Sequence, residues 1–223
     1  MTQYQLMTDK PYSDGLPAQL VILENKQCLR VTLMDIGATW LSCIVPIKGE
    51  EREVLLGVNS LADFESQTAY LGSTIGRYAN RINGGQLKIG SESYQLDTNE
   101  NGNTLHGGSQ GFDKRRWQIA EQTPTSVLFT LTSIDGDQGF PGTVTVSVRY
   151  SLTDNNRIEI NYSGSTDRPT VLNLTNHAYF NLLGAESGND CLSHRLTIAS
   201  KAYLPTNKFG IPNAHLTDVA GSP

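Results

Sequence analysis

Short runs in which apolar and polar residues alternate recur along the chain. The clearest run is TVTVSVRYS at 143–151, in which Val144, Val146, Val148 and Tyr150 alternate with polar or hydroxyl side chains. Successive side chains of a strand point to opposite faces, so this run predicts a strand with one face in the core. Other runs rich in β-branched and apolar residues predict strands at 29–34, 40–47, 53–57, 127–132, 157–162 and 195–199.

Turn signals rich in glycine, aspartate and asparagine separate many of these runs. Only 60–66, with Ser60 as a plausible N-terminal cap, has a helical pattern. Many strands without long helices between them exclude a doubly wound parallel sheet and favour an all-β fold, a large antiparallel β-sandwich. A chain of 223 residues can form one such unit, so a single domain over 1–223 is expected.

The run NLTNHAYFNL at 173–182 has an unusual polar face. In an extended conformation its mostly apolar face carries Leu174, Asn176, Ala178, Phe180 and Leu182, and its polar face carries Asn173, Thr175, His177, Tyr179 and Asn181. A strand face exposed to solvent usually carries lysine, glutamate or arginine. This one offers neutral donors and acceptors and one imidazole, which suits a ligand rich in hydroxyl groups.

Composition excludes several other classes of function. The formal net charge of −5 argues against a nucleic-acid partner, and the basic cluster DKRRW at 113–117 is more typical of a solvated strand end. Three cysteines, Cys28, Cys43 and Cys191, without a C-x-x-C spacing predict neither a disulfide framework nor a zinc site. The sequence shows no signal peptide and no stretch that could span a bilayer, which favours a cytoplasmic location without membrane partners.

Each candidate residue also has a purely structural interpretation. His177 could be a hydrogen-bonded structural histidine, and His106 could be a turn histidine between a leucine and two glycines. In GRYANRI at 76–82, Arg77 is expected to pair with a buried carboxylate. The glycine-rich loop 101–111 lacks the ending of a phosphate-binding loop, and the acidic loop 133–142 lacks the spacing of a calcium loop and predicts a tight hairpin connection.

Seven motifs in order along the chain resemble the aldose 1-epimerase (galactose mutarotase) family. They are DIGATW (35–40), EVLLGVNSLADF (53–64), GRYANRI (76–82), GNTLHGG (102–108), DGDQGFPG (135–142), NLTNHAYFNL (173–182) and YLPTNKFGIP (203–212). The resemblance implies a β-supersandwich with a sugar cleft open on one face. It also implies interconversion of the α and β anomers of aldohexoses such as galactose and glucose.

The resemblance also implies roles for individual residues. His177 lies at the position of the family's general acid, which protonates the ring oxygen of the sugar, and an imidazole suits this step because both of its protonation states are accessible near neutral pH. Asn80, Arg81, His106 and Tyr179 match the family's groups that bind the sugar hydroxyls. The family's reaction implies a small-molecule sugar as the partner and neither cofactor nor metal.

The family's base, a glutamate, and a substrate-binding aspartate are expected beyond residue 223, so the chain resembles an N-terminal portion of a mutarotase that lacks its C-terminal strands. Without the base, most of the acid–base rate enhancement, on the order of 10²–10⁴-fold for each partner, is expected to be lost. Uncovered sheet edges are expected to favour self-association. The alternatives are a hexose-6-phosphate 1-epimerase, a non-catalytic sugar-binding or regulatory protein, and a carbohydrate lyase or hydrolase, for which no convincing carboxylate pair is visible.

Overall fold

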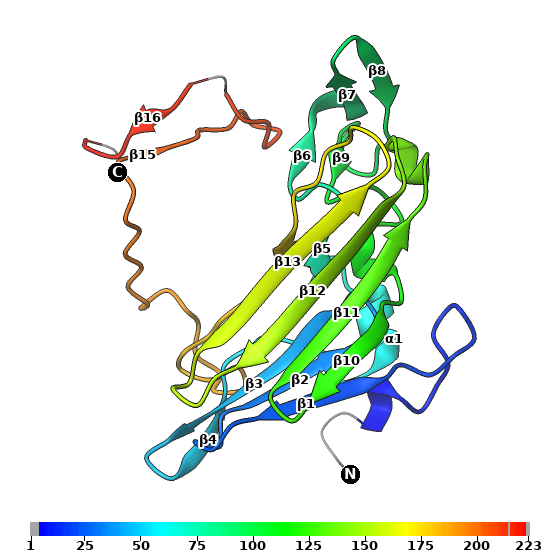
Figure 1. Ribbon diagram of the computed structural model, residues 1–223. Helices are drawn as coiled ribbons and strands as arrows, with labels where there is room; N and C mark the ends of the chain where they lie inside the picture. Colours follow the sequence, from blue (N-terminus) through cyan, green and yellow to red (C-terminus); the bar gives the residue numbers. More distant parts are fainter. Residues whose placement is uncertain (1–4, 214, 222–223) are drawn as a thin grey trace.

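The computed structural model describes residues 5–213 and 215–221. Two four-stranded antiparallel sheets form its main body (Figure 1). The first has the order β1 (Leu20–Glu24), β2 (Arg30–Met34), β3 (Thr39–Ile47) and β4 (Glu50–Glu53). The second has the order β10 (Gln118–Thr123), β11 (Ser126–Ser133), β12 (Val144–Leu152) and β13 (Ile158–Thr166).

One hydrophobic core joins the two sheets. It contains Val31 and Leu33 of β2 together with Phe129 of β11 and Val146 and Val148 of β12, all of them buried. The strand β12 shows the predicted period of two, with every second side chain buried. The all-β sandwich predicted from the sequence is confirmed.

Short strand pairs and turns surround this body. The pairs are β5 (Thr74–Ile75) with β14 (Thr175–Asn176), β6 (Arg81–Ile82) with β9 (Thr104–Leu105), β7 (Gln86–Ile89) with β8 (Glu92–Gln95), and β15 (Ala202–Tyr203) with β16 (Thr217–Asp218). The helical turns are η1 (Gln5–Met7), η2 (Asn83–Gly85), η3 (Phe112–Lys114) and η4 (Asp137–Gly139). The helix α1 spans Leu61–Ser66, and the Ser60 side chain accepts the Asp63 amide at 3.1 Å, as the sequence predicted. No helix in the described ranges is long and apolar enough to cross a membrane.

Three expected strands differ from the structure. Residues 54–57 of the expected strand 53–57 lie outside β4. The Glu53 carboxylate accepts the Leu55 amide there, and Leu55 forms only a single bridge with Phe180. The segment 173–182 contains only the two-residue strand β14 and isolated bridges. Residues 195–199 form no strand, since Leu196 and Ile198 are 84% and 70% exposed with no neighbouring strand in the described part of the chain.

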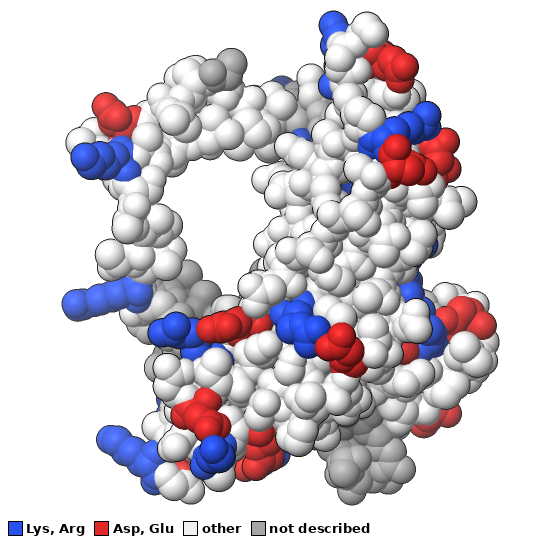
Figure 2. All heavy atoms as spheres, viewed as in Figure 1, with Lys and Arg blue, Asp and Glu red and all other residues white. Residues whose placement is uncertain are grey.

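The segment from about residue 189 onward leaves the sandwich as an arm (Figure 1). Figure 2 shows an opening between this arm and the body of the molecule. The arm returns to the body at its loop 205–212, where Gly210 lies against the guanidinium group of Arg81: a Cβ atom added to Gly210 would lie 2.7 Å from Nη1. The loop thus contacts a residue that the sequence analysis assigned to sugar binding.

Candidate functional site

His177 follows β14 and is fixed through its backbone. Its N–H donates to the Ser73 carbonyl at 2.9 Å, and its own carbonyl accepts the Gly72 N–H at 3.0 Å. The preceding Asn176 side chain is turned inward, where it donates to the Gly72 carbonyl at 2.7 Å and to the Tyr150 hydroxyl at 3.1 Å. Alternation along the extended chain then directs the His177 ring away from the core.

Three rings gather around His177, so that four rings from three separate segments form one cluster. The ring centre of His106 lies 5.2 Å away in an edge-to-face arrangement, and that of Tyr179 lies 5.1 Å away. Tyr70, from the loop before β5, lies 4.7 Å from His106 and 5.7 Å from His177. The structure therefore brings together three residues that the sequence analysis proposed, and adds Tyr70.

Two reciprocal hydrogen bonds hold His106 beside Asn80. The Asn80 N–H donates to Nδ1 of His106 at 3.0 Å, and the His106 N–H donates to the Asn80 carbonyl at 3.0 Å. Because Nδ1 accepts, the neutral ring carries its proton on Nε2, where it can be donated to a ligand. Burial, with smaller contributions from His177 and Arg81, lowers the pKa of His106 to about 4, and Glu100 opposes part of this effect. His106 is therefore a neutral hydrogen-bond donor at physiological pH.

Glycine is required immediately after His106. At Gly107 φ is +93°, and an added Cβ would lie 1.9 Å from the Gly76 carbonyl oxygen. No other residue could adopt this conformation in that space. Gly107 therefore allows the backbone after His106 to lie against the backbone of Gly76, and this close approach fixes the position of His106.

Arg81 begins β6, where it pairs with Leu105 of β9, the residue before His106. Its guanidinium group forms a two-point ion pair with the Glu100 carboxylate, at 2.8 and 3.1 Å. This hydrogen bonding raises the pKa of Arg81. The Nη1 atom also lies 3.4 Å from the Asn80 side-chain oxygen. The pairing of β6 with β9 thus places Arg81, Asn80 and His106 together.

Three residues of this cluster have left-handed backbones although none is a glycine. The φ angles are +56° at Tyr70, +71° at Asn80 and +55° at His106. Such conformations cost about 1–3 kcal/mol each and persist only where the surroundings impose them. Their concentration around one pair of imidazoles marks this surface as the candidate functional site.

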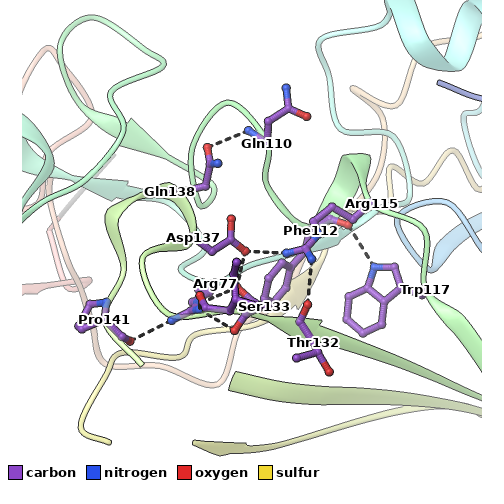
Figure 3. Close-up of polar contacts among 11 residues, drawn as sticks. Arg77, Gln110, Phe112, Arg115, Trp117, Thr132, Ser133, Asp137, Gln138 and Pro141 are labelled. Atoms are coloured by element: carbon purple, nitrogen blue, oxygen red, sulfur yellow. Dashed lines mark hydrogen bonds and ion pairs between the residues drawn. The ribbon is translucent and has the colours of Figure 1, made fainter. Parts of the chain in front are cut away.

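Arg77 does not form the expected pair with a buried carboxylate, so that prediction is wrong. Its buried guanidinium group donates to Ser133 Oγ at 2.8 Å and to the backbone carbonyls of Ser133, Ile134 and Pro141 at 2.7–3.0 Å (Figure 3). Asp137 instead accepts from Ser133 Oγ and pairs with Arg115 at 2.6 Å (Figure 3). Arg77 is a structural residue that holds the predicted hairpin connection between β11 and β12.

The basic cluster at 113–117 is also structural. Besides Arg115, Arg116 pairs with Asp14 at 2.5 Å and with the buried Asp35. Trp117 is buried and donates to the Phe112 carbonyl at 3.1 Å. Both arginines are thus engaged by carboxylates, rather than solvated as the sequence suggested.

Tyr70 and Glu100 belong to the site although no motif of the sequence pointed to them. Tyr70 lies two residues before Gly72, whose added Cβ would lie 2.0 Å from the Trp40 carbonyl oxygen. This position, two residues before a glycine, is the only signal in the sequence that points to Tyr70, and it is weak. Glu100 lies in a loop of polar residues where nothing distinguishes it from a solvated glutamate.

Solved structures define the class of protein to which this arrangement belongs. An aldose epimerase homologue from C. elegans superposes with a TM-score of 0.83 at 30% identity, over 92% of this chain and 62% of that chain. A galactose 1-epimerase from Lactobacillus acidophilus superposes with a TM-score of 0.79 at 29% identity, over 94% and 61%. The chain thus has the all-β sandwich fold of these aldose and galactose 1-epimerases.

Sequence comparison defines the family. Residues 19–223 match the family model described as aldose 1-epimerase. The aldose 1-epimerase of Haemophilus influenzae is 49% identical over 209 residues, which are 94% of this chain and 61% of the relative. The galactose mutarotase of Mus musculus is 41% identical over 195 residues, which are 87% of this chain and 56% of the relative. The chain belongs to the aldose 1-epimerase family and spans about three fifths of the length of these relatives.

Proposed function

We propose that the protein acts on aldohexoses such as galactose and glucose and interconverts their α and β anomers. The proposal rests on family membership together with one observation. The imidazole of His177 lies 5.2 Å from the imidazole of His106 and within one cluster with Tyr179, beside the ion pair of Arg81 with Glu100. Neutral donors and acceptors around an acid–base group suit a polyhydroxylated, uncharged substrate.

In the proposed reaction, His177 donates a proton to the ring oxygen of the pyranose while the anomeric hydroxyl loses its proton to a base. The bond between C1 and the ring oxygen breaks, which gives the free aldehyde. Rotation about the C1–C2 bond and attack of the released hydroxyl on the other face of C1 then close the ring with both proton transfers reversed. No residue of this chain is assigned to the base.

The other site residues bind and orient the sugar in this proposal. His106 donates from Nε2, Tyr179 offers its hydroxyl group, and Asn80 and Arg81 contact the hydroxyl groups on one side of the ring. Positioning matters because a reacting group misplaced by an ångström can lose roughly 100-fold in rate. The ion pair of Arg81 with Glu100 fixes the guanidinium group for this role.

Polarimetry tests the proposal. Freshly dissolved α-D-galactose is followed with the protein, without it, and with His177→Ala. Acceleration that is lost in His177→Ala supports the assigned acid, whereas acceleration that survives unchanged refutes it. Galactose binding measured by calorimetry without any acceleration would favour the non-catalytic sugar-binding alternative. The same assay with galactose 6-phosphate separates the hexose-6-phosphate 1-epimerase alternative.

We propose in addition that residues 1–223 fold as one domain and that copies of the chain associate through exposed sheet edges and apolar side chains. The strand β13 is an edge strand of its sheet: it pairs with β12 on one side and with no strand of the described residues on the other. Free backbone groups at such an edge can pair with another chain. A single cooperative unfolding transition would support the one-domain assignment, and two separated transitions would contradict it.

We further propose a cytoplasmic location. Cys28, Cys43 and Cys191 are free thiols, which persist in a reducing compartment. Cell fractionation with an antibody against the protein tests this assignment. Recovery in the membrane or secreted fraction would contradict it.

A further inference from the structure

Tyr70 is held in a strained conformation from both sides. Its φ is +56°, and its carbonyl accepts the Ser73 N–H at 3.1 Å. On the N-terminal side, the Gln67 side chain accepts the Ala69 N–H at 2.8 Å. On the C-terminal side, Gly72 donates to the His177 carbonyl at 3.0 Å. The backbone that carries Tyr70 is therefore tied directly to the backbone of His177.

The Tyr70 ring contacts both imidazoles, and Tyr70 also lines a cavity. It contacts His106 edge-on at 4.7 Å and His177 at 5.7 Å between ring centres. Tyr70 also lines a cavity of about 450 Å³, whose walls include Phe64, Glu100 and Asp113 but neither histidine. Without the ring, water from this cavity would reach the imidazole pair.

We propose that Tyr70 is a positioning residue, whose ring keeps His106 edge-on to His177 and separates both imidazoles from the adjacent cavity. The backbone strain at Tyr70 is then the cost of presenting this ring at a single orientation. Nδ1 of His106 remains on the Asn80 N–H, and Nε2–H remains available for a sugar hydroxyl. The catalytic part of this inference rests on the proposed function, whereas the structural part does not.

Loss of the ring would change the protonation of His106. The charged and titratable groups that face His106 are His177, Arg81, Glu100 and the phenol of Tyr70 itself. Burial is the main cause of the lowered pKa of His106. Access of water would relieve that burial and raise the pKa of His106 toward the ordinary value of about 6.5. A protonated His106 carries hydrogen on both nitrogens, so the hydrogen bond from Asn80 to Nδ1 would be lost.

The test is an NMR titration of the His106 ring in Tyr70→Ala, Tyr70→Leu and Tyr70→Phe, with Tyr94→Ala as the control. Tyr94 lies in β8, and the charged groups that act on it are Glu92, Arg168 and Asp135, none of which belongs to the site. Tyr70→Ala is expected to raise the pKa of His106 by about one unit or more, and Tyr70→Leu by less, because leucine still covers the ring. Tyr70→Phe and Tyr94→Ala are expected to leave the pKa unchanged. Circular dichroism confirms that each variant is folded.

A wild-type pKa of His106 in folded Tyr70→Ala would overturn the proposal. If Tyr70→Ala does not fold, a wild-type pKa of His106 in folded Tyr70→Leu would overturn the proposal instead. Polarimetry supplies a second readout. In Tyr70→Ala, kcat/KM is expected to fall roughly tenfold or more, and the acidic limb of the pH–rate profile is expected to move to higher pH. Tyr70→Phe is expected to keep the wild-type kcat/KM and the wild-type pH–rate profile. The NMR result does not require catalysis, so failure of the proposed function and failure of this inference are distinguishable.

Discussion

At the scale of single residues, Asp113 is a buried carboxyl group with an unsatisfied atom. Its side chain is only 6% exposed, and its Oδ1 atom has no hydrogen-bond partner among the described residues. Burial raises the pKa of Asp113 to about 6, and Lys114 offsets only part of this effect. The ionised form is therefore destabilised in the folded protein at neutral pH.

Asp113→Asn is expected to stabilise the protein at pH 7 and to leave it nearly unchanged at pH 4. The folded-state pKa of about 6 exceeds the unfolded value of about 3.9, so the contribution of Asp113 to stability is complete below pH 4 and is lost as the pH rises through 6. The difference is about 2–3 kcal/mol in the free energy of unfolding. Urea denaturation of both proteins across this pH range measures it.

Asp135→Asn is the control for this titration. The Gly142 amide and Arg168 lower the pKa of the exposed Asp135, so the pH dependence of its contribution has the opposite sign. Equal slopes of stability against pH in wild type and Asp113→Asn would contradict the prediction.

Arg77 donates to three backbone carbonyl groups, of which those of Ser133 and Pro141 are buried. Arg77→Met is expected to destabilise the fold by about 3–5 kcal/mol, because the carbonyl oxygens of Ser133, Ile134 and Pro141 lose the donor that they share. Arg149→Met, which breaks a pair with Glu121 near the surface, is expected to cost under about 1 kcal/mol. Thermal or urea unfolding compares the two variants, and similar losses would contradict a special role for Arg77.

At the scale of elements, the loop 205–212 contributes to the surroundings of Arg81. The loop is closed by a bridge between Thr206 and Pro212, and the Asn207 side chain accepts the Phe209 and Ile211 amides at 2.9 and 3.1 Å. This closed turn presents Gly210 to Arg81. The side chain that the proposed function assigns to sugar binding is therefore held by Glu100 on one side and the arm on the other.

Gly210→Ala is expected to weaken galactose binding. Its Cβ would lie 2.7 Å from Nη1 of Arg81, so the guanidinium group or the loop must move. Gly188→Ala is a matched control, because φ is +74° there and +73° at Gly210 but no atom lies within 4 Å of the added Cβ. Calorimetry is expected to show a lower affinity, by roughly tenfold, in Gly210→Ala alone. Equal affinities in the two variants would exclude a role for the loop contact.

Periodicity predicted the long elements well and the short ones poorly. The run 143–151 became β12 because its alternation matches a ladder with a partner on each side. The run 195–199 has similar composition but no partner, and composition does not determine pairing. For the site, motifs singled out His106 and His177. Tyr70 meets them only through the fold, 36 and 107 residues away in sequence, so its weak local signal could not reveal this contact.

At the scale of the whole molecule, charge and apolar surface are distributed differently. On the face drawn in Figure 2, basic and acidic side chains lie close to one another, without a continuous basic surface. Apolar exposure is concentrated instead along the arm, where Leu192, Leu196, Ile198 and Leu216 are 70–85% exposed. Exposed apolar side chains gathered in one segment are typical of a contact surface.

The double variant Leu196→Ser, Ile198→Ser is expected to reduce the self-association proposed above. The substitutions remove exposed apolar surface that a contact between copies would bury. Burial of such surface is worth about 25 cal/mol per Å². Ile134→Ser, which changes an equally exposed isoleucine in the turn between β11 and β12, is the control. Sedimentation velocity over a concentration series measures the effect. Identical behaviour of the double variant and wild type would place any association elsewhere, at the edge of β13.

Because the arm contacts Arg81, the proposed sugar binding depends on an intact peptide chain outside the sandwich. Arg195 and Lys201 are exposed and lie outside any strand, between the sandwich and the loop that reaches Arg81. A trypsin-like protease that cuts at either position would sever the loop and leave the two sheets intact. Such a nicked protein would keep its melting behaviour while it loses affinity for galactose.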